Sequence, residues 1–279
     1  MRGQMYYLGI ILASIIGYFI GSISWSIIVV KYVKGIDIRA VGSKNAGATN
    51  TTRELGKYWG FIVALLDGCK SVVTALIAML FSMIPNDLFK ETSYFIPMLF
   101  VLIGHCYPIY YKFKGGKAVA SFMGFLFVAN PFYFGFFLLV WFVVVWKTRK
   151  VSIASIVAAL ATCLIFIWLP WINGINSFSG GWNSWEQWQG VWSNPWLRFS
   201  WINYLHQLTA PISHHQFAEN ILAINTMILM GMTMLAYRHF PNIIRIKNHK
   251  EPKTFPTLTP EQKLEYQKHI KDRSKKQKK

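Results

Sequence analysis

The chain has 279 residues, of which 53% are hydrophobic, 16% aromatic and only 14% charged, and its formal net charge is +18. Soluble domains carry about a quarter charged residues, so this composition excludes an ordinary water-soluble protein. The apolar residues form runs of about 20, the length that crosses a hydrocarbon core, and the sequence therefore predicts an all-α integral membrane protein.

Seven apolar segments suited to a membrane follow one another along the chain. Asn130-Pro131 is a turn signal that divides one long run into two short segments. The expected segments are residues 5–33, 58–84, 93–111, the two pieces of 118–146, 151–170 and 217–237. We therefore expect about seven membrane helices, two of them short.

The basic residues are concentrated in a few polar regions. Of the 29 lysines and arginines, 25 lie in residues 31–57, 112–117, 147–150 and 238–279. With seven membrane segments all four regions fall on one side, which the positive-inside rule makes the cytoplasmic side. The amino terminus is then outside and the carboxy terminus is cytoplasmic.

The chain divides into one membrane domain and a tail. Residues 1–249 form the predicted domain, and within it the Trp-rich segment 171–215 is expected to be an insertion on the outer side, with its aromatic residues as interfacial anchors. Residues 250–279 form a basic tail, expected to be disordered and attracted to anionic lipid. The three cysteines lie in apolar segments, so we expect neither a disulfide nor a metal site.

The first polar segment carries groups that suit a phosphate. Residues 42–50 combine glycines with hydroxyl and amide side chains, and arginines lie on both sides. Such a run can wrap a phosphate through backbone N–H groups and charge-assisted hydrogen bonds. A tight loop without a ligand is an equal alternative, because Gly, Ser and Asn are also the commonest turn formers. The candidates are Arg39, Ser43, Asn45, Thr49, Asn50 and Arg53.

The second polar segment places Gly115, Gly116 and Lys117 at the start of the next apolar segment. Helix starts attract anions through their unsatisfied N–H groups and the helix dipole, and a lysine adds a mobile charge. The alternative is a flexible turn with an interfacial lysine. His105, which precedes this segment, would by itself more often be a satisfied interior histidine than a catalyst.

Two further clusters precede or follow apolar segments. Ser152 and Ser155 are three residues apart on one helix face, a spacing that by itself usually only permits close packing. His239, Asn242 and Arg245 also recur at steps of three and can face one side of a helix. In addition, Asp67 and Lys70 lie within the second membrane segment, as either a functional group or a structural ion pair.

Taken in chain order, these motifs resemble the signatures of the acyl-phosphate-dependent glycerol-3-phosphate acyltransferases, the PlsY family. The resemblance covers residues 21–253, without the Trp-rich segment. Lys44 departs from it, because the family usually has glycine there. The matching elements are Gly42-Ser43-x-Asn45-x-Gly47-Ala48-Thr49-Asn50 with Arg53, Asp67-x-x-Lys70, Gly104-His105, Phe113-x-Gly115-Gly116-Lys117, Val151-Ser152-x-Ala154-Ser155, and His239-x-x-Asn242-Ile243-x-Arg245 with Glu251.

The resemblance implies attack by the 1-hydroxyl of glycerol 3-phosphate on a fatty acyl phosphate at the cytoplasmic face of the cell membrane. The product is lysophosphatidic acid, and no cofactor, metal or nucleic acid is implied; the partners are the two substrates and membrane lipids. The implied catalytic residues are His105, Lys117, Ser152 and His239. The implied phosphate-binding residues are Arg39, Ser43, Asn45, Thr49, Asn50, Arg53, Gly115, Gly116, Lys117, Ser155, Asn242 and Arg245.

Two other function classes remain open at this level. A transporter of phosphorylated solutes would place charged groups near the membrane midplane, usually from two repeats. Only Asp67 and Lys70 lie inside a span, and the sequence has no evident repeat. A membrane scaffold or lipid-binding protein without activity is the other alternative.

Overall fold

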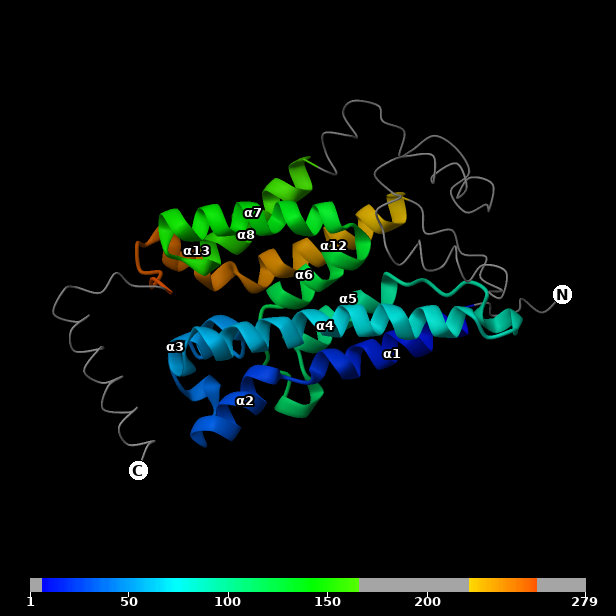
Figure 1. Ribbon diagram of the computed structural model, residues 1–279, viewed down its shortest axis with the longest axis horizontal. Helices are drawn as coiled ribbons and strands as arrows, with labels where there is room; N and C mark the ends of the chain where they lie inside the picture. Colours follow the sequence, from blue (N-terminus) through cyan, green and yellow to red (C-terminus); the bar gives the residue numbers. More distant parts are fainter. Residues whose placement is uncertain (1–6, 166–220, 255–279) are drawn as a thin grey trace.

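The structure is a computed structural model that describes residues 7–165 and 221–254. All regular structure in these two ranges is helical (Figure 1), which confirms the predicted all-α class. Within them, three helical stretches are long and apolar enough to cross a membrane: Leu8–Lys34, Lys57–Ser82 and Pro131–Thr148. The Trp-rich segment 171–215 and most of the basic tail lie outside the described residues.

The helices follow the predicted segments with two differences in length. α6 is short, as expected, but α7 has 18 residues and can span, while α5 has only 11. The described helices are α1 Leu8–Ser22, α2 Trp25–Lys34, η1 Ile38–Ala40, α3 Ala48–Leu55, α4 Lys57–Ser82, η2 Asp87–Phe89, α5 Ile96–Cys106, η3 Ile109–Tyr111, α6 Val119–Ala129, α7 Pro131–Thr148, α8 Val151–Cys163, α12 Ile221–Arg238 and α13 Phe240–Lys247.

The turn predicted between α6 and α7 is present. Asn130 takes an extended conformation, and its Oδ1 accepts a hydrogen bond from the amide of Phe132 at 2.9 Å. Pro131 occupies the first position of α7, where its missing N–H is not needed. The asparagine cap and the proline therefore begin a new helix at this point.

The predicted segment 5–33 is not one continuous helix, because it breaks after Ser22 and continues as α2. The Ser22 hydroxyl donates to the carbonyl oxygen of Tyr18 at 2.8 Å and accepts from the amide of Ile109 at 3.4 Å. Gly21 packs so closely on α5 that an added Cβ would collide with main-chain atoms. Mean hydropathy does not reveal such a break, because residues 8–34 remain apolar as a whole although Ser22, Ser24 and Ser26 lie at the break.

The helices form two packed layers around a common core. α1 contacts α4 and α5, α7 contacts α8, and α12 contacts α5, α6 and α8. In Figure 1 the layer of α1 and α4 lies below that of α7, α8 and α12, with α6 between them. The buried rings of Phe95, Phe122, Phe125 and Phe137 contact one another in the centre.

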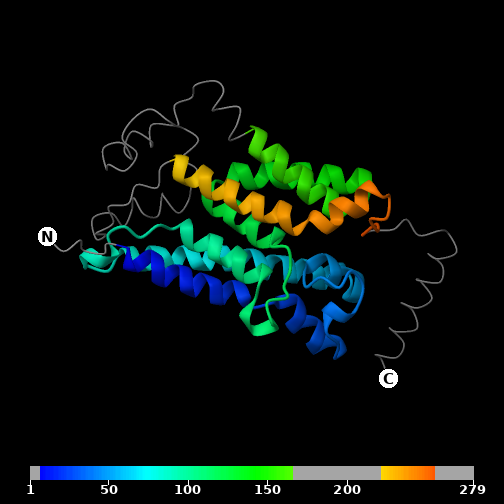
Figure 2. The same ribbon diagram turned by 180° about the vertical axis from the view of Figure 1, so that it is seen from behind.

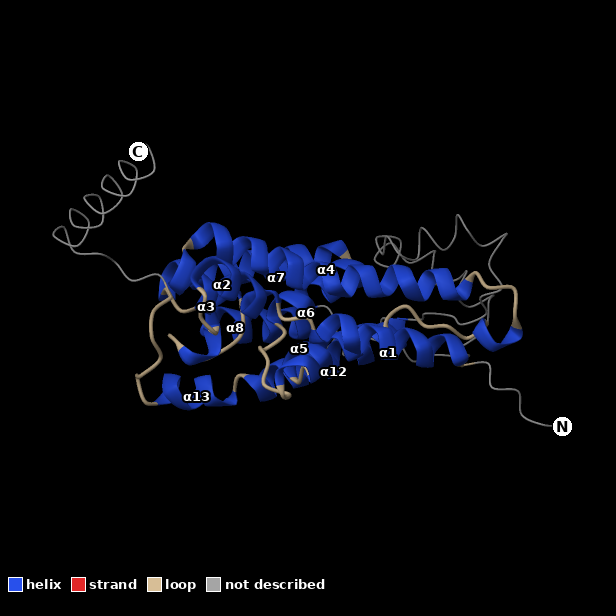
Figure 3. Cartoon of the chain, turned by 90° about the horizontal axis from the view of Figure 1, so that it is seen from below, coloured by secondary structure: helices blue, strands red, loops and turns tan. Residues whose placement is uncertain are grey.

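The short helices gather at one end of the bundle. Figure 3 shows α2, α3 and α13 at the same end, opposite the beginning of α1, and Figure 2 shows this arrangement from behind. The polar segments that connect them therefore come together, as the distribution of basic residues predicts.

Asp67 and Lys70 of α4 form an ion pair inside the bundle. Lys70 Nζ lies 2.7 Å from Asp67 Oδ1, and the two side chains are 3% and 2% exposed. The ammonium also donates to the carbonyl oxygens of Gly21 and Ile23, which lie at the end of α1. Helix ends leave such carbonyls without helical partners, so Lys70 stabilises the break between α1 and α2. The imidazole of His105 completes the cluster, with Nδ1 3.7 Å from Asp67 Oδ1.

Replacement of this lysine is predicted to destabilise the fold. Lys70→Met leaves the Asp67 carboxylate buried without its partner, which costs about 3 to 5 kcal/mol. The double variant Lys70→Met/Asp67→Asn removes the orphaned charge and should recover part of this loss. Unfolding of the purified protein in detergent measures both.

The exposed Lys34–Glu54 pair provides the control. Lys34→Met should change the free energy of unfolding by about 1 kcal/mol or less. Equal effects of Lys34→Met and Lys70→Met would contradict a structural role for the buried pair.

Candidate active site

The carboxylate of Glu251 is the centre of a polar cluster at the end of the bundle where the short helices gather. Its Oε1 accepts hydrogen bonds from Ser152 Oγ and from Asn242 Nδ2, the latter at 2.7 Å. Its Oε2 accepts from Arg245 Nε at 2.9 Å. Burial by itself would raise the pKa of Glu251, but these three hydrogen bonds lower it overall, so the group is a carboxylate at neutral pH.

Lys117 joins this cluster from the loop between α5 and α6. Its Nζ donates to Asn242 Oδ1 at 2.5 Å. Burial lowers the pKa of Lys117 to about 8, Glu251 opposes the shift, and Arg245, Arg238 and Arg53 add to it. The ammonium therefore sits among cations with a single carboxylate nearby, an environment that an additional anion would stabilise.

Arg53 brings the first polar segment to the same place. Its Nη2 donates to Thr254 Oγ1 at 3.3 Å, and burial lowers the pKa of the guanidinium. The amide of Thr254 in turn donates to the carbonyl oxygen of Arg149 at 2.8 Å. One carboxylate is thus surrounded by groups from α3, the loop between α5 and α6, the start of α8 and the segment after α13. Cations outnumber it, so the site suits a phosphate-bearing ligand.

The two histidines lie in different places. His239 is 2% exposed and follows α12, and its Nδ1 lies 2.8 Å from the carbonyl oxygen of Leu235, so Nδ1 carries the proton that bonds. Burial lowers the pKa of His239 to about 4, and the charge of Lys117 adds to this effect. His105 instead lies in α5 against Asp67, with its Nε2 directed at Gly116.

The Gly115 and Gly116 amides, which are expected to donate to phosphate, have main-chain partners in the structure. The Gly115 N–H donates to the carbonyl oxygen of Cys106 at 3.2 Å, and the Gly116 N–H donates to that of His105 at 3.0 Å. A Cβ on Gly116 would collide with the His105 ring and with the carbonyl of Ala46. The glycines therefore permit close packing of the loop on α5, and their N–H groups are occupied.

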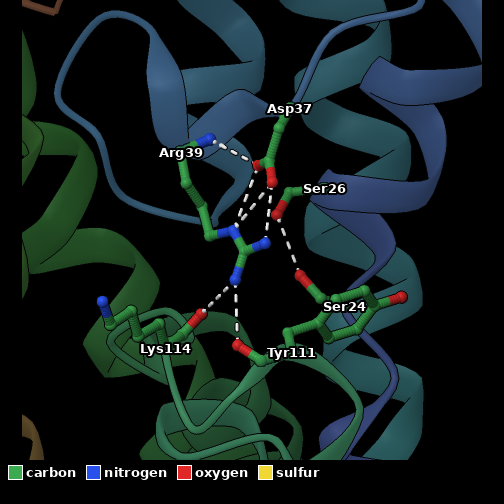
Figure 4. Close-up of polar contacts among 6 residues, drawn as sticks. All are labelled: Ser24, Ser26, Asp37, Arg39, Tyr111 and Lys114. Carbon is green, nitrogen blue, oxygen red and sulfur yellow. Dashed lines mark hydrogen bonds and ion pairs between the residues drawn. The ribbon is translucent and has the colours of Figure 1, made fainter.

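Three other expected phosphate ligands are also engaged within the protein. Asn50 Oδ1 accepts from the Ser43 amide, and its Nδ2 donates to two carbonyl oxygens of the same loop. Ser155 Oγ donates to a carbonyl in its own helix and accepts from Trp141 Nε1. Arg39 pairs with Asp37 and binds carbonyls of the second loop (Figure 4). These side chains shape the site because their polar atoms already have partners.

Of the remaining candidates, Ser43 and Asn45 lie on the loop that Asn50 holds, and Thr49 lies in the first turn of α3. The side chain of Ser43 is exposed, and those of Asn45 and Thr49 are partly buried. Lys44, which stands where the related family usually has glycine, has a φ of 56°. A glycine adopts that left-handed conformation at little cost. Phosphate contacts by Ser43, Asn45 and Thr49 stay predictions.

Sequence reasoning missed two participants and the central position of a third. Arg238 donates to the carbonyl oxygens of Gly115 and Gly116, and Thr254 contacts Arg53. Glu251 belongs to the carboxy-terminal motif, but its contacts with Ser152 join residues 99 positions apart. For Arg238, the signal in the sequence was its position next to His239.

Comparisons with known proteins show the family of this chain. Residues 11–249 match the family model described as glycerol-3-phosphate acyltransferase. A glycerol-3-phosphate acyltransferase of Mycoplasma mycoides is 57% identical over 257 residues, 92% of this chain and 97% of the relative. That of Mesoplasma florum is 49% identical over 250 residues, 90% of this chain and 96% of the relative.

A solved structure is also similar. It is the crystal structure of PlsY, an integral membrane glycerol 3-phosphate acyltransferase, in its glycerol 3-phosphate form. The TM-score is 0.60 at 30% sequence identity, and the match covers 88% of this chain and 96% of the other.

The position of Lys117 predicts a pH-dependent anion affinity. Below pH 8 the ammonium is protonated and should bind inorganic phosphate; above the lowered pKa of about 8 the charge is lost and the affinity should fall. Lys117→Ala should weaken binding at pH 7.5 by roughly 10- to 150-fold, the equivalent of about 1.5 to 3 kcal/mol, and should remove the decline between pH 7.5 and 9.5. Isothermal titration calorimetry checks both.

Lys112 on the same loop is the matched control, because its side chain is exposed. Lys112→Ala should keep both the affinity and its pH dependence. A wild-type affinity that is constant from pH 7.5 to 9.5 would contradict the assignment of Lys117 to the anion site.

Proposed function

Since the chain belongs to the glycerol-3-phosphate acyltransferase family and is an integral membrane acyltransferase, we propose that its acyl donor is a fatty acyl phosphate. The products are then lysophosphatidic acid, acylated at the 1-position, and inorganic phosphate. The observation that carries this proposal is the cluster in which Lys117, Arg53 and Arg245 surround the single carboxylate of Glu251. Two substrates that both bear phosphate need such an excess of cations.

The proposed reaction needs positioning more than it needs a strong nucleophile. The 1-hydroxyl oxygen bonds to the acyl carbon, the bond from that carbon to the phosphate oxygen breaks, and phosphate leaves. Lys117 and Arg53 neutralise the two substrate anions, with Ser43, Asn45, Thr49, Asn242 and Arg245 as further phosphate contacts. Because Asn242 and Arg245 are held by Glu251, their remaining donors are oriented before substrate arrives, which lowers the reorganisation cost.

We assign removal of the hydroxyl proton to the phosphate oxygens of the donor. His239 is neutral at pH 7 with Nδ1–H bound to Leu235, which leaves Nε2 as its only acceptor. His105 is enclosed between Asp67 and Gly116, so it is proposed to support the loop. We therefore propose a hydrogen-bonding role for His239 and a packing role for His105, and Ser152 is proposed to act through Glu251.

In the decisive experiment the purified protein is incubated with labelled glycerol 3-phosphate and one of three additions: palmitoyl phosphate, palmitoyl-CoA or no donor. Product should form with palmitoyl phosphate alone. Lys117→Ala should lower kcat/KM by roughly 10- to 150-fold, and Gly116→Val should also lose activity because its side chain displaces His105. Product from palmitoyl-CoA alone would refute the proposed donor.

The same assay tests the proton route. His105→Ala and His239→Ala should each retain measurable turnover, since neither is the proposed base. A loss beyond about 10⁴-fold in either variant, the upper range for general base catalysis, would instead identify that histidine as the base.

The proposed orientation places the cluster on the cytoplasmic side of the cell membrane. Cysteines introduced at Lys44 and at Lys275 should then resist impermeant thiol reagents in intact cells, whereas one at Ser184 should react. The native Cys69, Cys106 and Cys163 should stay unlabelled. Labelling of position 44 from outside would reverse the orientation and separate the site from cytoplasmic substrates.

A further inference from the structure

The loop from Tyr107 to Lys117 has an unusual main-chain course. Lys112 and Phe113 have φ values of 57°, and Ala118 directly after Lys117 has 59°. Residues other than glycine seldom adopt these left-handed conformations, which persist only where surrounding contacts hold them. The course of the loop therefore has to be imposed by other parts of the protein.

One of these contacts comes from the end of α12. Arg238 Nε and Nη2 donate to the carbonyl oxygen of Gly116 at 3.2 and 3.0 Å, and Nη2 lies 3.4 Å from that of Gly115. The guanidinium also lies over the ring of Tyr107, 5.0 Å from its centroid. A planar fork that holds two successive carbonyls fixes both the position and the direction of the loop.

A second contact comes from η1, which precedes the loop in the sequence, whereas α12 follows it. Arg39 Nη1 donates to the carbonyl oxygens of Tyr111 at 2.9 Å and Lys114 at 3.4 Å. The other donors of the same guanidinium, Nε and Nη2, donate to the carboxylate of Asp37 (Figure 4). All three groups of donors on Arg39 are therefore occupied within the protein, and its orientation is set by Asp37.

We infer that Arg39 and Arg238 are positioning residues that hold the loop by its carbonyl oxygens and thereby keep the Lys117 ammonium in the anion site. Lys117 follows directly after the last carbonyl that Arg238 binds. With the N–H groups of Gly115 and Gly116 on α5, the loop is attached on both edges. The consequence for acyl transfer rests on the proposed function; the consequence for Lys117 does not.

The lowered pKa of Lys117 supplies a direct readout of its position. Burial is the largest cause of that shift, so a displaced loop would expose the ammonium and raise its pKa. Arg39 is not among the charges that influence Lys117. The charged and titratable groups that face Lys117 are Glu251, Arg245, Arg238, Arg53 and His239.

The test uses Arg39→Lys and Arg238→Lys in the full-length protein. Both conserve charge, but a lysine cannot bind Asp37 and the two carbonyls together as the Arg39 guanidinium does, and it cannot reproduce the planar fork of Arg238. The pKa of Lys117 is measured by competitive acetylation at a series of pH values with mass spectrometry. In both variants it should rise from about 8 towards the ordinary 10.5. Acyl transfer should fall by up to about 100-fold, as for a misplaced catalytic group. Lys247→Met, which removes an exposed charge from α13, should leave both unchanged.

An unchanged Lys117 profile in folded Arg39→Lys and Arg238→Lys would overturn the inference, even if both variants were less stable. If Arg39→Lys does not fold, Asp37→Asn loosens the same guanidinium and should give the same rise. The acetylation readout requires no turnover. Absence of acyl transfer in the wild type would therefore reject the proposed function and leave the result for the loop standing.

Discussion

A main-chain carbonyl oxygen that has no partner in a helix must find another donor where little water reaches it. In this protein three cationic side chains supply that donor. Lys70 binds the carbonyls where α1 ends, Arg238 binds those of Gly115 and Gly116, and Arg39 binds those of Tyr111 and Lys114. The helix break and the loop that carries Lys117 both depend on these bonds.

This use of cations gives several conspicuous polar residues partners within the protein. Arg39 pairs with Asp37 and Lys70 pairs with Asp67, in each case a nearby carboxylate. Their other N–H groups donate to main-chain carbonyl oxygens. The cations that face the anion site, Lys117, Arg53 and Arg245, share a single carboxylate partner. Glu251 is the one acidic side chain among Lys117, Arg53 and Arg245 in the described cluster, so it holds the donors in place while the local charge stays positive.

The candidate site and the membrane fold are linked through α5. The in-span ion pair contacts His105, the main chain of His105 and Cys106 holds the amides of Gly115 and Gly116, and the next residue is Lys117. A chain of packed groups therefore connects the interior of the bundle with the anion site. The Asp67–Lys70 pair, which stands out in the sequence as charge within a span, therefore has a structural explanation: like the arginines that hold the loop, Lys70 binds main-chain carbonyls.

The sequence by itself determined the helical membrane class, the turn at Asn130-Pro131 and the set of polar segments that meet at one end. These follow from composition, apolar run length and charge distribution, which act locally along the chain. Only the tertiary structure decided the break after Ser22, the internal roles of Arg39, Asn50 and the glycine amides, and the central place of Glu251. Hydrogen-bond partners such as Lys117 and Asn242 are 125 residues apart, and a residue's type shows which bonds it can form but not which groups the fold brings within reach.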